Sequence, residues 1–297
     1  MESYRDYKNG ETGACVSIVT FVVLSAGKLF IGYFYHSKAL YADGFNNATD
    51  IIASLAILIG LRISQKPADH DHPYGHFRAE TVSSLVASFI MLAVGLQVFY
   101  QGVTAFNRPQ TTAPDSITAW VAAFSAVVMY LVYRYNTRLA KKINSGALAA
   151  AAKDSLSDAL VSVGALVAIV GSRYGMPWLD AVTAILIGLF ICKTAWDIFR
   201  DATHSLTDGF DSAKLLLLKK TIASTPGVSA IRDIKARQLG NRVLVDVVIL
   251  VEDRLTVWES HLITEEIEER MLKKHQIRYT HIHIEPAVNT SSTSTCS

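Results

Sequence analysis

Two segments that are apolar enough to lie inside a membrane each carry two polar residues four positions apart, Asn46 with Asp50 and Asp154 with Asp158. Positions i and i+4 share one face of a helix, so each pair points in one direction. A carboxylate at the centre of a bilayer costs roughly 2.5–3.5 kcal/mol on the lenient insertion scale, so three aspartates cost about 8–10 kcal/mol. A divalent cation that exchanges with protons would remove this cost, which predicts an intramembrane cation site.

The ligands of this predicted site are oxygens only. The three cysteines of the chain are far apart and form no CxxC motif, so neither a thiolate zinc site nor a disulfide framework is expected. Oxygen ligands suit Mn²⁺, Fe²⁺, Mg²⁺ or Ca²⁺ better than Zn²⁺ or Cu²⁺. Mg²⁺ releases water reluctantly and Ca²⁺ takes about six to eight oxygens, so four residues suit both poorly without added water. We therefore predict Mn²⁺ first and Fe²⁺ second. For Asn46 alone, helix capping or exposure to water is an equally good explanation.

The chain that must position these residues is strongly apolar. Hydrophobic residues make up 51% of its 297 residues, and the mean hydropathy is +0.28, which is too apolar for an ordinary soluble protein. A helix of about 20 apolar residues crosses a bilayer. Six such helices are predicted, at 15–35, 39–61, 80–106, 117–133, 147–170 and 178–199.

Basic residues are distributed unevenly over the predicted loops. Most loop lysines and arginines would lie on the side of the N-terminus, whereas the other side holds only Lys38, Arg108 and Arg173. The positive-inside rule therefore predicts cytoplasmic N- and C-termini in a cell membrane. Nucleic-acid binding has no support, because the sequence contains no basic helix and no basic patch interleaved with aromatic residues.

The composition changes after Asp208, where charged residues become frequent. Periodicity predicts helices at 212–224 and 257–274, and strands at 228–238, 242–251 and 278–285. The order αββαβ predicts a small α+β domain of the ferredoxin or metallochaperone type, with both helices on one face of the sheet. The predicted domains are a six-helix transmembrane domain at 1–208, a cytoplasmic α+β domain at 209–287 and a disordered tail at 288–297.

Two further groups of residues contain side chains that bind metals. The loop sequence from Asp69 to Glu80 is dense in histidine and aspartate, which is typical of metal-binding tracts, with a solvated polar loop as the alternative. Nearer the C-terminus, His261, His281, His283 and Glu285 are capable of binding metal. Their spacing alone favours scattered surface residues.

The six predicted helices, the αββαβ order and the run from His72 to Glu80 (His-Pro-Tyr-Gly-His-Phe-Arg-Ala-Glu) resemble the cation diffusion facilitator family over nearly the whole chain. The resemblance implies a homodimeric secondary transporter, not an enzyme, that exchanges a divalent metal for protons by alternating access without an organic cofactor. It also implies a transport site on the second and fifth helices, formed by Asn46, Asp50, Asp154 and Asp158.

The residue types of this implied transport site narrow the choice of metal. Zinc and cadmium transporters of the family usually place a histidine in the quartet, whereas this chain has none. Its Asn-Asp-Asp-Asp set is similar to that of bacterial manganese exporters in the family, in agreement with the hardness of the ligands. Mn²⁺ is therefore the expected cargo, with Zn²⁺, Fe²⁺ or Co²⁺ as the alternative.

The resemblance implies two further features near the cytoplasmic side. A second metal site in the loop would use Asp69, His72 and His76. Arg78 would pair with Asp208 and so link the third helix to the end of the sixth, near the dimer interface.

A metal site in the cytoplasmic domain is only partly implied. His261 and His283 match the zinc-binding relatives, and Glu285 stands where an aspartate is usual. Arg232 and Val248 occupy positions where those relatives have histidines, so a binuclear zinc site is not expected.

Two other classes of function are weighed against transport. An intramembrane aspartyl protease also needs two membrane aspartates, but its Gly-x-Gly-Asp signature is absent. A metal sensor would bind its ion in water, whereas the predicted quartet lies deep within the membrane. Both alternatives are therefore less favoured than a transporter.

Overall fold

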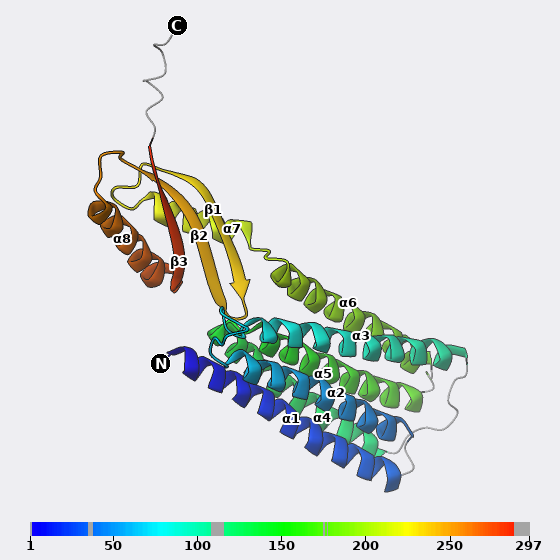
Figure 1. The fold of residues 1–297 in the computed structure, drawn as a ribbon. Helices are drawn as coiled ribbons and strands as arrows, with labels where there is room; N and C mark the ends of the chain where they lie inside the picture. Colours follow the sequence, from blue (N-terminus) through cyan, green and yellow to red (C-terminus); the bar gives the residue numbers. More distant parts are fainter. Residues whose placement is uncertain (1, 35–37, 108–115, 175, 177, 288–297) are drawn as a thin grey trace. The chain divides into compact units, whose positions relative to one another are not determined.

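The computed structural model describes residues 2–34, 38–107, 116–174, 176 and 178–287 (Figure 1). The chain divides into two compact units, Met1–Thr203 and His204–Ser297. The tail predicted at 288–297 lies outside the described residues, so its disorder stays a prediction.

Long helices build the first unit (Figure 1). They are α1 (Glu2–Phe34), α2 (Lys38–Ser64), α3 (Arg78–Asn107), α4 (Ser116–Ile143), α5 (Gly146–Arg173) and α6 (Trp178–Leu206). Each overlaps one of the six predicted spans. Within the described residues, length and composition alone qualify Gly10–Ile31 and Arg78–Thr104 as able to cross a membrane. Membrane crossing by the other four helices stays a prediction.

Helices α2 and α5 pack against each other inside this bundle. Ile57 and Leu61 of α2 share one buried apolar core with Leu148 of α5. Helix α2 also approaches α3 closely, since a Cβ atom at Gly60 would lie 2.3 Å from Oγ of Ser83. Small residues allow this kind of close helix packing in membranes. The packing brings the polar faces of α2 and α5 into the interior of the bundle.

A charged side chain is buried between α1 and α2. Nζ of Lys28 donates a hydrogen bond of 2.8 Å to Oδ1 of Asn47, and both residues are 1% exposed. Asn47 follows Asn46 directly and precedes Asp50 by three residues, so this contact supports the helix that carries half of the predicted quartet.

We predict that Asn47→Leu destabilises the protein by about 1.5–3 kcal/mol, because it removes a buried hydrogen bond from a charged donor. Thermal unfolding of the wild type, Asn47→Leu, Lys28→Met and the double variant in detergent measures the coupling between the two residues. The expected coupling energy is about 0.5–3 kcal/mol. Strictly additive effects of the two substitutions would contradict the contact.

The second unit is a small α+β domain with the predicted order αββαβ. Its elements are α7 (Ser212–Ala223), β1 (Ala230–Leu239), β2 (Arg242–Val251), α8 (Val257–His275) and β3 (Tyr279–Pro286). The sheet order is β1-β2-β3, with β1 antiparallel and β3 parallel to β2. Alternate residues of β2, among them Val247 and Ile249, are buried in one core with Ile222 of α7 and Ile267 of α8. Both helices therefore cover the same face of the sheet, as predicted.

The first strand begins two residues later than the predicted 228–238. The turn that ends α7 extends through Val228, whose N–H donates to the carbonyl of Thr225, and Gly227 adopts a φ of +88°. Periodicity alone could not reveal this, because the apolar Val228 fits the alternation of a strand equally well.

Candidate metal-binding sites

A cluster of three carboxylates lies inside the helical unit. Asp50 of α2 meets Asp154 and Asp158 of α5, and one oxygen from each lies within 4.8 Å of the others. Asp50 is 2% exposed and Asp158 is 6% exposed. The side chain of Asn46 lies outside the described part of the structure, so its membership in the cluster stays a prediction.

The spacing of these oxygens suits a single ion. Oxygens bound to one divalent cation at about 2.1–2.4 Å lie at most about 4.2–4.8 Å apart. Three ionised carboxylates without an ion would repel one another strongly in surroundings of low dielectric constant. A divalent cation or protons would relieve that repulsion, so the arrangement fits the exchange of one for the other.

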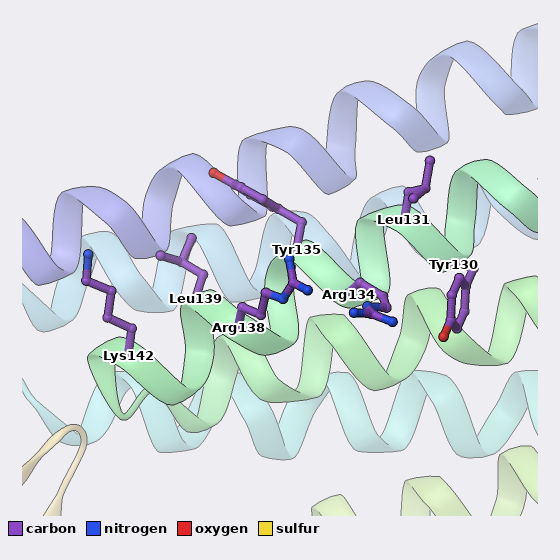
Figure 2. A pocket seen from close by; sticks show the side chains of 7 residues that line it. All are labelled: Tyr130, Leu131, Arg134, Tyr135, Arg138, Leu139 and Lys142. Atoms are coloured by element: carbon purple, nitrogen blue, oxygen red, sulfur yellow. The ribbon is translucent and has the colours of Figure 1, made fainter.

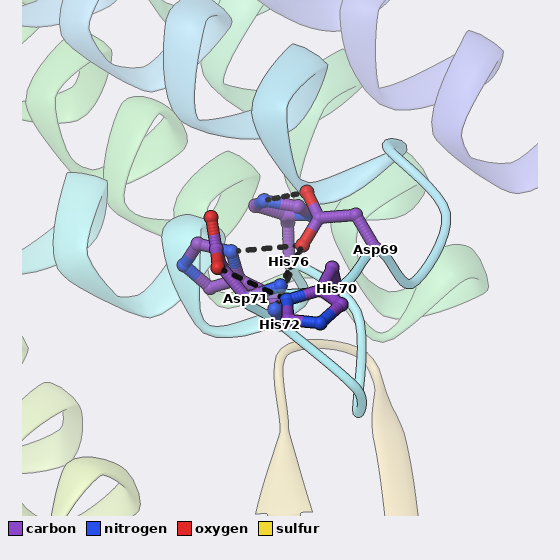
Figure 3. A network of polar contacts seen from close by, with 5 residues as sticks. All are labelled: Asp69, His70, Asp71, His72 and His76. Atoms are coloured by element: carbon purple, nitrogen blue, oxygen red, sulfur yellow. Dashed lines mark hydrogen bonds and ion pairs between the residues drawn. The ribbon is translucent and has the colours of Figure 1, made fainter.

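A second group lies in the loop between α2 and α3, where Asp69, His72 and His76 each offer a ligand atom within 4.8 Å of the others (Figure 3). Oδ1 of Asp69 lies 3.2 Å from Nδ1 of His72, and Oδ2 lies 3.5 Å from Nε2 of His76. His70 instead lies beside Asp71, with 3.6 Å between Nδ1 and Oδ1. The loop therefore brings Asp69, His72 and His76 together, whereas His70 pairs with Asp71.

The backbone of this loop holds Asp69 in its charged form. The N–H of His72 donates a hydrogen bond of 2.7 Å to Oδ1 of Asp69, and this bond is the largest cause that lowers the pKa of Asp69 below its usual value. A carboxylate with a lowered pKa stabilises the folded protein only while it is ionised. The stability that Asp69 contributes is therefore fully present above the ordinary pKa of an aspartate, and it is lost as the pH falls through the lowered pKa of Asp69. Asp69 is thus an anionic candidate ligand at neutral pH.

The three residues implied for a cytoplasmic metal site are not brought together within the described part of the second unit. His261 lies on α8, where Nε2 is 3.5 Å from Oε1 of Glu265. On β3, Nε2 of His283 lies 3.8 Å from Oε1 of Glu285. Arg232 forms a hydrogen-bonded ion pair with the other oxygen of Glu285. A guanidinium therefore engages one oxygen of Glu285, and metal binding by His261, His283 and Glu285 stays a prediction.

The predicted pair of Arg78 and Asp208 would join the two units and stays a prediction. Within the second unit, Oδ2 of Asp208 lies 3.9 Å from Nη1 of Arg237.

Glu80 is a functional candidate that sequence reasoning left without a role. It lies in the first turn of α3 and is buried, and its Oε1 accepts a hydrogen bond of 2.5 Å from Oγ of Ser145. Ser145 directly precedes α5, so Glu80 fixes the start of the helix that carries Asp154 and Asp158. The available signal was a carboxylate four residues after His76 in an otherwise apolar helix.

Helix α4 carries a groove of about 550 Å³ that is unsuited to cations (Figure 2). Arg134, Arg138 and Lys142 line it at helical spacing, together with Tyr130 and Tyr135. Three positive charges on one helix face repel metal ions. The groove also marks one end of α4 as strongly basic.

Comparison with known proteins identifies relatives along nearly the whole chain. The family model of the cation efflux transmembrane domain matches residues 14–207, and that of the cation efflux protein, cytoplasmic domain, matches residues 211–287. The manganese efflux system protein MneS of Bacillus subtilis (strain 168) is 59% identical over 287 residues, which cover 96% of this chain and 99% of that relative. The manganese efflux system protein MneP of the same organism is 30% identical, covering 92% and 95%. A solved structure of the MamM CTD in its copper form covers 29% of this chain and 96% of its own, at 23% identity and a TM-score of 0.25.

Proposed function

Because the chain belongs to the cation efflux family, we propose that it is a membrane transporter that exports Mn²⁺ from the cytoplasm in exchange for protons. The cluster of Asp50, Asp154 and Asp158 carries this proposal, since it offers three oxygen ligands within 4.8 Å and neither imidazole nor sulfur. Two relatives that match most of the chain bear the name manganese efflux system protein. Ligand chemistry and relatives thus favour the same ion.

The proposed cycle follows from charge balance. Mn²⁺ enters from the cytoplasm and displaces protons from the carboxylates, with Asn46 as the fourth ligand. The helices then rock, and protons from outside displace the ion. Because bare carboxylates are costly inside a membrane, they cross either with metal or with protons. This requirement couples the two fluxes.

The proposed orientation places both termini and the second unit in the cytoplasm. The basic end of α4, with Arg134, Arg138 and Lys142, supports this orientation under the positive-inside rule. We further propose a homodimer, supported by the match of residues 211–287 to the model named ZT_dimer. The site in the loop is proposed to hold a second metal ion through Asp69, His72 and His76.

Counterflow in proteoliposomes tests the proposed cargo. Vesicles that contain the purified chain are loaded with Mn²⁺ and offered Mn²⁺, Zn²⁺, Fe²⁺ or Co²⁺ under an imposed pH gradient. We expect Mn²⁺ to exchange fastest and its flux to depend on the gradient. Faster exchange of Zn²⁺ or Co²⁺ would favour the alternative cargo, and the absence of any flux would favour a metal sensor.

The loop offers a matched pair of histidines for testing the second site. In a chain with Asp50→Asn and Asp158→Asn, His76→Ala should weaken the remaining Mn²⁺ binding at least about tenfold, since it removes a ligand. His70→Ala should leave binding unchanged, because His70 contacts Asp71 and not Asp69. Electron paramagnetic resonance of bound Mn²⁺ measures both variants. Equal effects of the two substitutions would contradict the assigned ligands.

A further inference from the structure

On each of the two helices that carry the carboxylate cluster, a buried serine lies one helical turn beyond an aspartate of the cluster. Ser54 follows Asp50 by four residues on α2, and Ser162 follows Asp158 by four residues on α5. Residues four apart share a helix face, so both hydroxyl groups belong to the faces that carry the carboxylates. Ser54 is 1% exposed and Ser162 is 0% exposed.

Neither hydroxyl has a hydrogen-bond partner among the described residues. Other serines of α5 behave differently, since Ser155 donates to the carbonyl of Ala151 and Ser157 to that of Lys153, each at 3.1 Å. A buried serine in a helix usually satisfies its hydroxyl in this way. A buried polar group left unsatisfied in a native protein requires an explanation, and binding of an ion or a water molecule is one such explanation.

The two serines lie on opposite sides of the cluster along the bundle. Three chain reversals separate α2 from α5, so the two helices run in opposite directions (Figure 1). Four residues advance about 6 Å along a helix. Ser54 is therefore displaced from the cluster toward the end of α2 that leads into the loop, and Ser162 is displaced toward the other end of the bundle.

We propose that Ser54 and Ser162 are transient oxygen ligands of the transported divalent cation, one on each side of the carboxylate cluster. This inference rests on the proposed function and orientation, in which Ser54 lies on the cytoplasmic side and Ser162 on the outer side. A hydroxyl oxygen replaces one water of the partly dehydrated ion as it enters or leaves the carboxylates. A neutral ligand suits such a step, because it binds the ion weakly enough to release it.

Initial uptake of Mn²⁺ into inside-out and right-side-out membrane vesicles that contain no Mn²⁺ tests the two sides separately. Ser54→Ala is expected to raise the KM for Mn²⁺ about tenfold from the cytoplasmic face, and Ser162→Ala to do so from the outer face, with the magnitude typical of a lost metal-supporting group. Ser155→Ala and Ser157→Ala are the matched controls and should leave both KM values unchanged.

A change in KM that is equal at both faces, or no change in either variant, would overturn the proposal. Ser54→Cys and Ser162→Cys provide a second readout, because a sulfur ligand favours softer ions. Each should increase competition by Cd²⁺ from its own face only, and unchanged competition would count against a ligand role.

Asp50→Asn separates a failure of this inference from a failure of the proposed function. If it abolishes uptake while the serine variants behave as wild type, only this inference fails, whereas uptake at the wild-type rate removes the proposed function itself.

Discussion

Replacement of Asp50 or Asp158 by asparagine is expected to reduce Mn²⁺ export at least about 100-fold, since even outer-shell partners of metal ligands commonly contribute 10–100-fold. Both side chains are buried in the cluster of three carboxylates. Asparagine keeps the size of the side chain but removes the charge that balances the cation. Uptake of Mn²⁺ into inside-out vesicles measures the loss.

Folding should survive these substitutions, because each removes a charge from an apolar bundle and creates none. Asp201→Asn is the matched control, since Asp201 is exposed near the end of α6 and lies 3.8 Å from Arg200. It should transport at the wild-type rate. Export at that rate by Asp50→Asn or Asp158→Asn would show that the cluster is not the transport site.

Asp154→His is expected to shift selectivity toward Zn²⁺ and to raise the ratio of Zn²⁺ to Mn²⁺ transport at least about tenfold, because imidazole suits Zn²⁺ better than carboxylate does. Asp154 lies in the same cluster, one turn from Asp158, so the new nitrogen would join two remaining carboxylates. Competition between the two ions in counterflow measures the ratio.

Asp154→Glu separates ligand type from ligand size. It retains a carboxylate on a longer side chain, so it should keep the preference for Mn²⁺ even if the rate falls. An equal shift toward Zn²⁺ in the glutamate and histidine variants would mean that geometry, not ligand hardness, sets the selectivity.

Much of the fold follows from periodicity and polarity. The strand predicted at 242–251 coincides with β2, and α8 begins at Val257 as predicted, where the structure adds a capping box of Thr256 and Glu259. Boundaries that depend on turn geometry were less predictable, as the late start of β1 shows. Local alternation contains no information about the hydrogen bond from Val228 to Thr225.

In the candidate site, too, features set by neighbouring residues were predictable, whereas contacts between residues far apart in the sequence were not. Spacing of four residues predicted which aspartates share a face, and the structure brings Asp50, Asp154 and Asp158 together. The sequence contains no comparable pattern for contacts between residues that are far apart along the chain. Lys28 and Asn47 are 19 residues apart, and Glu80 and Ser145 are 65 apart, so their pairing depends on how the helices pack.

Proton release on Mn²⁺ binding shows whether Mn²⁺ and protons compete for the carboxylate cluster. The purified chain with His76→Ala, which removes one proposed ligand of the loop site, is titrated with Mn²⁺ in a weakly buffered solution that contains a pH indicator. One Mn²⁺ is expected to bind per chain with release of protons, and both the binding and the release should be lost when Asp50→Asn and Asp158→Asn are added. Stoichiometric binding without acidification, or binding that persists in those variants, would contradict it.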